Sequence, residues 1–165
     1  MKTIYLIGFM GAGKTTIGKD LAKQWNLSVF DTDEEIVKRT GMSIPSIFST
    51  KGEKTFRDLE TDILTKLPVD DNIVTTGGGI VLKEENRSWM KETGHVIFLD
   101  VSPQEVLRRL SEDSSRPLLN SEKEKSVYNL LNQRLPLYQS TAHFQIQTDG
   151  KSPKEIILEL ENCLK

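Results

Sequence analysis

Eight residues near the start of the chain, Gly8–Thr15, have the types and the spacing of a phosphate-binding loop. They read Gly-Phe-Met-Gly-Ala-Gly-Lys-Thr and match G-x-x-x-x-G-K-[ST] in full. Glycines let backbone N–H groups converge on phosphate oxygens, and the N-terminus of the helix that follows adds partial positive charge. Lys14 can reach the β- and γ-phosphates, and the Thr15 hydroxyl can ligate Mg²⁺. The glycines of an ordinary turn would not explain Lys-Thr at this offset, so the pattern predicts a nucleoside triphosphate site.

The phosphate loop alone does not name a reaction, because ATPases, GTPases and kinases share it. The chain has no Asn-Lys-x-Asp segment for reading guanine, and neither His-Arg-Asp nor Asp-Phe-Gly, which excludes a protein kinase. It also lacks G-x-G-x-x-G, which argues against a dehydrogenase. A kinase for a small molecule is favoured, and a GTP-dependent switch or a catalytically silent binding protein stays open.

Asp31 and Asp33 are the first candidates for the acceptor side, since they flank Thr32 at the end of an expected strand. On an extended chain, residues two apart share a face. Two carboxylates near a phosphate loop can serve Mg²⁺ or substrate hydroxyls, and one beside a hydroxyl can accept its proton during attack on the γ-phosphate. The alternative is a pair of acids that complements a helix dipole.

Three further groups can hold an acceptor. Arg57 and Glu60 lie three residues apart on an expected helix, so Glu60 can brace the guanidinium for bidentate capture of a carboxylate. An ordinary surface ion pair, worth under about 1 kcal/mol, fits the same spacing equally well. Gly77–Gly79 either let a ligand approach the backbone closely or form a flexible turn. Arg116 and Arg134 can neutralise transferring phosphate, although single arginines are more often solvated.

The elements that must position these residues follow from short apolar runs that alternate with helical patterns. This alternation predicts an α/β fold with a parallel sheet covered on both faces. Ligands of such sheets bind beyond the carboxyl ends of the strands, where the loops identified above would meet. A helix is expected over Thr15–Trp25. The expected strands are Thr3–Ile7, Leu27–Phe30, Asn72–Thr75, His95–Asp100 and Phe144–Gln147.

Two later helix starts are marked by Ser-Pro-x-Glu at Ser102 and at Ser152. Both predict a capping box, in which the Ser hydroxyl caps the helix, Pro takes the first helical position and Glu reaches back three residues later. We interpret both as stability devices without a role in the site.

Two regions interrupt the alternation of strands and helices. Residues 33–67 hold helical segments with no strand between them, where Gly41 is expected to end the first helix and Ser43 to cap the next. Residues 112–125 are polar and charged and include Arg116. A loop of that length in a compact domain is usually functional or disordered, and the functional interpretation is a lid.

Length and composition predict one soluble domain. The chain has 165 residues with 22 basic and 24 acidic side chains, and this lack of a basic excess argues against nucleic acid as a partner. No stretch approaches the roughly 20 apolar residues of a membrane span. Cys163 is the only cysteine, which suits a reducing compartment such as the cytoplasm, and the cysteine and histidines have no zinc-ligand spacing.

Taken together, the motifs resemble the shikimate kinase family over essentially the whole chain. The phosphate loop is generic to P-loop proteins, whereas the order and spacing of the other pieces are more specific. The sequence departs from the family's usual pattern at Pro45 and Ser46, where a polar residue and an acid are more common. The matching pieces are residues 8–16, Phe-Asp-Thr-Asp at 30–33, Gly-Glu-x-x-Phe-Arg-x-x-Glu at 52–60, Gly-Gly-Gly at 77–79, Arg-Pro-Leu-Leu at 116–119 and Arg-x-Pro-Leu-Tyr at 134–138.

The resemblance implies a three-layer α/β P-loop fold like that of nucleoside monophosphate kinases, with a five-stranded parallel sheet flanked by helices. Within one domain, 1–165, it implies a helical substrate-binding insertion at 33–61 and a lid at 111–125. It implies a cytoplasmic monomer that transfers the γ-phosphate of ATP, with Mg²⁺, to the 3-hydroxyl of shikimate, a step toward chorismate and aromatic amino acids.

By the same resemblance, three residues are expected to be catalytic: Lys14, Asp33 and Arg116. Thr15 and Asp31 would hold Mg²⁺. Nucleotide contacts are expected from Gly11, Ala12, Gly13, Lys14, Thr15, Thr16, Arg109, Arg116 and Lys151. Shikimate contacts are expected from Asp33, Phe48, Arg57, Gly78, Gly79 and Arg134. The nearest alternative is gluconate kinase, which shares the fold, but Arg57 and Arg134 with the glycine run favour shikimate.

Overall fold

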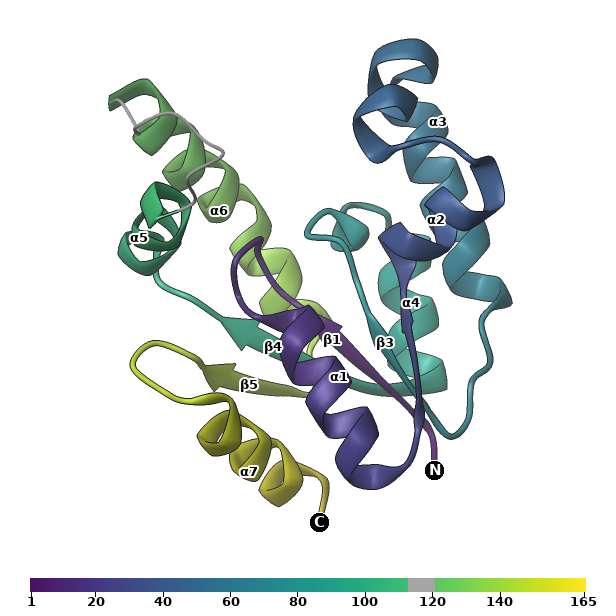
Figure 1. Cartoon of the computed structure of the whole chain (residues 1–165), viewed down its shortest axis with the longest axis vertical. Helices are drawn as coiled ribbons and strands as arrows, with labels where there is room; N and C mark the ends of the chain where they lie inside the picture. The colour runs from purple at the N-terminus through teal and green to yellow at the C-terminus, as the bar shows by residue number, and fades with distance from the viewer. Residues whose placement is uncertain (113–120) are drawn as a thin grey trace.

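The chain folds around a five-stranded sheet whose paired strands all run parallel, in the order β2-β3-β1-β4-β5 (Figure 1). This computed structural model describes residues 1–112 and 121–165. The strands are β1 (Thr3–Ile7), β2 (Ser28–Asp31), β3 (Asn72–Thr75), β4 (Gly94–Asp100) and β5 (Phe144–Gln147). The predicted α/β fold is confirmed, with β2 shifted by one residue and β4 beginning one residue earlier than expected.

Helices cover both faces of the sheet, which makes the predicted three layers. Contacts place α1 and α7 on one face, and α4 and α6 on the other. No helix within the described residues is long and apolar enough to cross a membrane. The helices are α1 (Lys14–Trp25), α2 (Thr32–Thr40), α3 (Ile44–Lys66), the 3₁₀ turn η1 (Ile80–Leu82), α4 (Glu84–Thr93), α5 (Pro103–Glu112), α6 (Ser121–Thr141) and α7 (Pro153–Leu164).

The strand order sets the position of the functional loops. β1 lies between β3 and β4. After β1 the chain builds β2 and β3 on one side of it, and it then crosses to build β4 and β5 on the other side. The carboxyl end of β1 is therefore a topological switch point, where open parallel sheets bind ligands. Asp31 pairs in register with Thr75, which brings the ends of β2 and β3 together beside the loop that follows β1.

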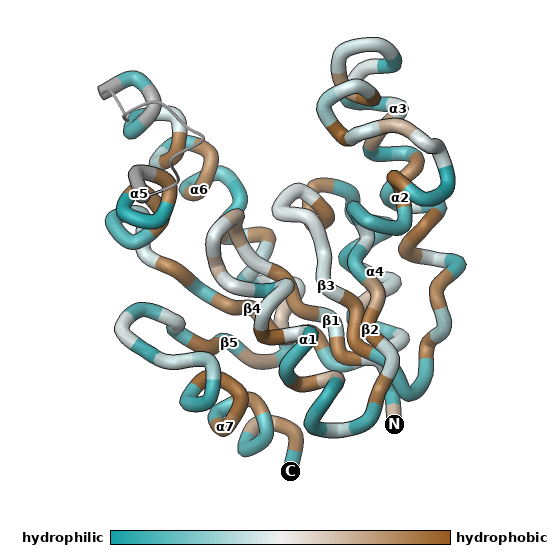
Figure 2. Tube along the Cα trace, in the orientation of Figure 1, coloured by the Kyte–Doolittle hydropathy of each residue, from teal (hydrophilic) through white to brown (hydrophobic). Residues whose placement is uncertain are grey.

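The main core sits between the sheet and its two helical layers. All five residues of β1 are buried, as expected for a central strand covered on both faces. Brown, apolar segments lie along the central strands β1 and β4, where the hydrophobic core is gathered (Figure 2). A rigid central strand holds the start of the phosphate loop in place.

The insertion after β2 has a small core of its own. α2 ends at Gly41 and Ser43 caps α3 through the N–H of Ser46, as predicted. Pro45 takes a first-turn position of α3, where proline is tolerated. Inside α3, Gly52 has φ 87° and ψ 166°, which breaks the helix into two parts. The buried residues of this second core are Ile36, Ile47, Phe56 and Ile63.

Two local predictions are wrong in part. Ser102 and Ser152 do cap their helices, but the backbone N–H of Ser102 donates to Asp149 Oδ1 at 3.0 Å, and Glu105 pairs with Arg108 and Arg109 instead of reaching back. Residues 121–125 of the expected lid loop form the first turns of α6. Arg116 lies outside the described residues.

Candidate active site

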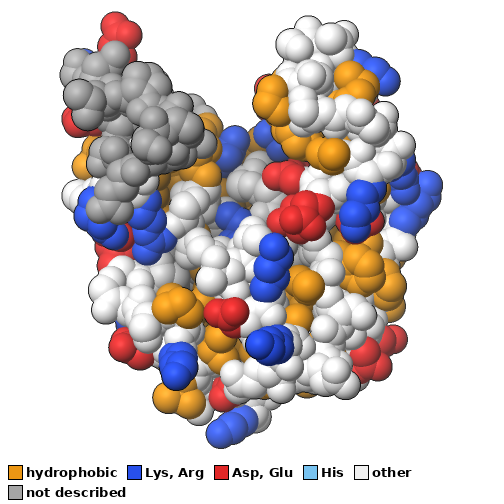
Figure 3. Space-filling view, viewed as in Figure 1, with side chains coloured by type: hydrophobic (Ala, Val, Ile, Leu, Met, Phe, Trp, Pro, Cys, Tyr) orange, Lys and Arg blue, Asp and Glu red, His pale blue; other side chains and the backbone are white. Residues whose placement is uncertain are grey.

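The phosphate loop joins β1 to α1 and leaves the helix N-terminus open. Gly13 occupies the cap position in the left-handed region, with φ 89°, and has no side chain to cap the first N–H groups of α1. These donors therefore remain available to an anion. A cavity of about 350 Å³ lies against them. Its lining residues are Met10, Gly11, Gly13, Lys14, Thr15, Thr16, Asp31, Asp33, Thr76, Gly77 and Gly78. Figure 3 shows the molecular surface hollowed beside the α2–α3 arm.

Lys14 is buried beneath this cavity, and its ammonium folds back onto the loop. Lys14 Nζ donates to the carbonyls of Gly8 at 2.7 Å and Phe9 at 2.9 Å. Burial lowers the pKa of Lys14 to about 8, against the carboxylates of Asp33 and Asp31, which raise it. Phosphate oxygens in the cavity would offer this ammonium stronger partners than neutral carbonyls.

Asp31 lies at the centre of a small group of oxygen atoms at the end of β2. Its Oδ2 accepts from Thr75 Oγ1 at 2.9 Å and from Thr15 Oγ1 at 3.5 Å. Its Oδ1 accepts from the N–H of Glu34, so Asp31 is also the N-cap of α2. Carboxylate and hydroxyl oxygens are the donors Mg²⁺ prefers, and Mg²⁺ usually takes only one or two protein ligands beside phosphates. The arrangement therefore fits a magnesium ion held between Thr15, Asp31 and a nucleotide.

Asp31 and Asp33 were expected to lie on one extended segment. Asp33 instead lies in the first turn of α2. Its Oδ1 is buried and has no hydrogen-bond partner within residues 1–112 and 121–165. Burial raises the pKa of Asp33, and the Asp31 carboxylate raises it further, whereas Lys14 and Arg57 lower it. An unpartnered carboxylate oxygen beside a phosphate cavity can accept a hydroxyl proton.

A second cavity, of about 210 Å³, adjoins the first on the side of the insertion. Its lining residues are Met10, Asp33, Ile44, Phe48, Phe56, Arg57, Glu60, Gly77, Gly78, Gly79 and Arg134. The two cavities share Met10, Asp33, Gly77 and Gly78. A small molecule in the second cavity would therefore lie directly against phosphate held in the first.

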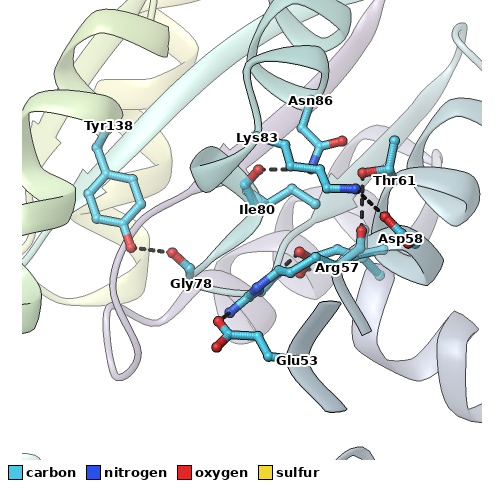
Figure 4. A network of polar contacts seen from close by, with 12 residues as sticks. Glu53, Arg57, Asp58, Thr61, Gly78, Ile80, Lys83, Asn86 and Tyr138 are labelled. Atoms are coloured by element: carbon cyan, nitrogen blue, oxygen red, sulfur yellow. Dashed lines mark hydrogen bonds and ion pairs between the residues drawn. The ribbon is translucent and has the colours of Figure 1, made fainter. Parts of the chain in front are cut away.

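Arg57 and Glu60 form a buried pair, and this decides between the two interpretations of their spacing. Arg57 Nη1 donates to Glu60 Oε1 at 3.0 Å, and the Glu60 side chain is only 1% exposed. The guanidinium also lies over the rings of Phe48 and Phe56, at 6.0 Å and 5.1 Å from their centroids. Its Nη2 also lies 3.4 Å from Oε1 of the exposed Glu53 (Figure 4). A guanidinium held by these contacts is preorganised to receive a carboxylate.

Burial of Glu60 has a consequence for stability. Burial raises the pKa of Glu60 to about 7, although Arg57 opposes the shift. A carboxyl group whose pKa is higher in the folded than in the unfolded chain stabilises the fold below the unfolded pKa, and this contribution is lost as pH rises toward the folded pKa. As the pH rises from 4.5 to 7, the free energy of unfolding of the wild type should therefore decrease more than that of Glu60→Gln, which has no carboxyl group at this position. Urea unfolding at pH 5 and 7.5 measures this, and parallel pH dependences would contradict it.

The glycine run leaves room for the two arginines. A Cβ at Gly79 would lie 2.4 Å from Arg57 Nη1, and one at Gly78 would lie 3.3 Å from Arg134 Nη1. Any side chain at Gly79 would therefore displace the guanidinium. The glycine run therefore lies directly against the protein's own arginines, and the expected backbone contact with a ligand stays a prediction.

Among the described residues, four buried polar atoms of side chains that line the second cavity have no hydrogen-bond partner. Buried polar groups are almost always hydrogen-bonded, so these four atoms are suited to bind a polar ligand. Their charges are complementary to a ligand with both hydroxyl and anionic groups. They are Asp33 Oδ1, Glu60 Oε2, Arg57 Nε and Arg134 Nε.

The remaining expected nucleotide residues are distributed unevenly. Thr16 lines the phosphate cavity, whereas Ala12 is buried in the loop itself. Arg109 donates from Nη1 to the carbonyl of Gly11, so it lies over the phosphate loop. Lys151 pairs with Glu159 at 2.6 Å and lines neither cavity. Met10 lines both cavities and was missed, because it occupies a variable position of the loop motif.

Comparison with known proteins decides the family. The family model described as shikimate kinase matches residues 10–165. This chain belongs to the shikimate kinase family. It is therefore an ATP-dependent kinase, and the expectation drawn from its motifs is confirmed.

Individual relatives of this family member agree over almost its full length. A shikimate kinase from Bacillus anthracis is 47% identical and covers 98% of this chain and 97% of its own length. One from Caldicellulosiruptor bescii is 44% identical, covering 93% and 90%. The solved structure of shikimate kinase from Acinetobacter baumannii in complex with shikimate is 38% identical, with a TM-score of 0.87 over 100% of this chain and 96% of that chain.

Proposed function

We propose that this chain transfers the γ-phosphate of ATP to the 3-hydroxyl of shikimate, giving shikimate 3-phosphate and ADP. One observation carries the proposal: unpartnered carboxylate and guanidinium atoms line a small cavity that opens directly onto the phosphate cavity. Shikimate offers both hydroxyls and a carboxylate to such a set. The relative from Acinetobacter baumannii has shikimate bound, which supports the same substrate here.

The acceptor roles follow from the charges in the second cavity. Arg57 and Arg134 receive the carboxylate of shikimate, Gly78 and Gly79 add backbone contacts, and the Phe48 ring forms an apolar wall. At the opposite end, Asp33 holds the hydroxyl that attacks and accepts its proton. The insertion at 33–61 therefore serves as the substrate-binding part of a single domain.

The donor roles follow from the phosphate cavity. Gly11–Thr16 hold the phosphates, and Lys14 neutralises the charge that develops during transfer. Thr15 and Asp31 would hold Mg²⁺, which would supply positive charge to neutralise the phosphates. Arg109, which lies over the phosphate loop, and Lys151 would contact the adenine side of the nucleotide, and Arg116, outside the described residues, would neutralise the transferred phosphate. A monomer in the cytoplasm stays a prediction.

A coupled assay of ADP release tests the proposal. Turnover should require shikimate, ATP and Mg²⁺ together, and chelation of Mg²⁺ with EDTA should abolish it. Gluconate and nucleoside monophosphates serve as competing acceptors, and GTP as a competing donor. Turnover of gluconate in place of shikimate, or a preference for GTP, would overturn the assignment.

Arg57→Ala should raise the KM for shikimate by about 10- to 100-fold, because charge-assisted hydrogen bonds to the carboxylate are lost. The KM for ATP should change much less. Arg39→Ala is the matched control, since Arg39 belongs to the same insertion but forms only an exposed ion pair with Asp62. Equal losses for both substrates would indicate a folding role for Arg57.

A further inference from the structure

The side chain of Tyr138, on α6, contacts the glycine run Gly77–Gly79 beside the second cavity, which is called the acceptor cavity from here on. Its side chain is fully buried, and its ring stacks on Phe98 of β4 with centroids 5.0 Å apart. Its hydroxyl donates to the carbonyl of Gly78 at 2.5 Å (Figure 4). Burial raises the pKa of Tyr138 to about 12, so the hydroxyl keeps its proton and remains the donor at neutral pH.

The hydrogen bond from Tyr138 fixes the one carbonyl of the glycine run that the local turn leaves free. Gly77 O accepts from the N–H of Ile80, and Gly79 O accepts from the N–H of Leu82, both at 3.1 Å. Both of these bonds belong to the turn that leads into η1. Three glycines in succession have wide conformational freedom, so a contact from another element is needed to hold the middle carbonyl in one orientation.

Orientation of this carbonyl determines the direction of a donor in the site. The Gly78 carbonyl and the Gly79 N–H belong to one planar trans peptide, in which they point in opposite directions. Because the carbonyl is turned toward Tyr138, the Gly79 N–H is turned away from it. Gly79 lines the acceptor cavity and lies against the Arg57 guanidinium.

The same hydroxyl also lies near Arg134, which is four residues earlier on α6: a Cβ at Gly78 would be 3.3 Å from Arg134 Nη1 and 3.6 Å from the Tyr138 hydroxyl. Arg134 and Gly79 approach the acceptor cavity from two different elements, α6 and the loop after β3. Tyr138 is therefore the point at which these two elements are joined.

We propose that Tyr138 is a positioning residue of the acceptor site: its hydroxyl fixes the Gly78–Gly79 peptide so that the Gly79 N–H donates to the substrate carboxylate beside Arg57 and Arg134. This inference rests on the proposed function. It assigns Tyr138 no contact with the substrate, since the hydroxyl acts through the peptide and the guanidinium.

Tyr138→Phe tests the inference, because it removes the hydroxyl and keeps the stacked ring. The KM and the directly titrated Kd for shikimate should both rise about tenfold, while the KM for ATP stays within about twofold. An analogue of shikimate without the carboxylate should bind wild type and variant equally. The N–H resonance of Gly79 should also shift in the variant.

Tyr5→Phe is the matched control. Tyr5 is as deeply buried as Tyr138, and its hydroxyl is hydrogen-bonded to Thr93 Oγ1 at 2.8 Å, before the start of β4. The two variants should lose similar stability in a melting experiment, and only Tyr138→Phe should bind shikimate more weakly. Equal changes in both variants, or an unchanged Kd in Tyr138→Phe, would overturn the inference. Wild type that does not bind or phosphorylate shikimate would instead overturn the proposed function.

Discussion

Replacing Lys14 by methionine should lower turnover by about 10²- to 10³-fold or more, while the protein stays folded. Phosphoryl transfer depends on positioning and on neutralising charge, and Lys14 lines the phosphate cavity. Among the described residues, its ammonium donates to two neutral carbonyls. Methionine keeps the apolar stem of the side chain in its buried position. The substitution should therefore lower the rate of phosphoryl transfer and change the stability of the fold little.

Lys19→Met is the matched control for charge. Lys19 is an exposed residue of the same helix, α1, so its replacement removes one positive charge without touching the loop. Steady-state kinetics of both variants, with melting temperatures alongside, separate the local effect from a general one. Wild-type turnover by Lys14→Met would refute the proposed role of Lys14.

Local sequence patterns were sufficient for the sheet and the phosphate loop. β1, β3 and β5 begin and end at the residues expected from the alternation of short strands with helical patterns. The phosphate loop was equally predictable, since its glycines and its Lys-Thr pair stand at fixed positions of a known sequence motif. Helix caps at Ser43, Ser102 and Ser152 followed from a side chain that bonds within one turn.

Features set by contacts between distant segments were not predictable in the same way. Glu105 was expected to complete a capping box, but two arginines on its own helix compete for its carboxylate, and Asp149, 47 residues from Ser102, takes the place of Glu105 at the Ser102 N–H. Asp31 is the N-cap of α2, so the helix begins at Thr32 and Asp33 lies in its first turn. In both cases the local structure depends on which of several available groups a carboxylate binds.

The acceptor side of the site shows the same limit. The spacing of Arg57 and Glu60 allowed a surface pair or a braced guanidinium, and only the packing of α3 against the glycine run makes Glu60 buried. Tyr138 belonged to a recognised motif, but its contact with Gly78 spans 60 residues of sequence. Residues whose role depends on a partner elsewhere in the chain carry no local signal of it.

Replacing Asp33 by asparagine should lower kcat by about 10²- to 10⁴-fold, the range for loss of a general base. Asparagine keeps the size of the side chain and can still contact a hydroxyl, but it cannot take the proton. The affinity for ATP should change little. Because burial raises the pKa of Asp33, wild-type activity should fall as pH drops through this elevated pKa, and the variant's residual activity should lack that fall.

The kinetic pattern distinguishes a base from a group that only orients the hydroxyl. An orienting group would raise the KM for shikimate and leave most of kcat, whereas a base acts on kcat. Glu34→Gln is the control, since Glu34 is an exposed acid in the same first turn of α2 and its replacement removes the same charge from the helix N-terminus. A pH–rate profile for Asp33→Asn that keeps the wild-type acidic fall would assign the proton to another group. Glu60 is a candidate, since its Oε2 lies beside Gly77 together with Asp33 Oδ1: a Cβ at Gly77 would be 3.2 Å from the first and 3.0 Å from the second.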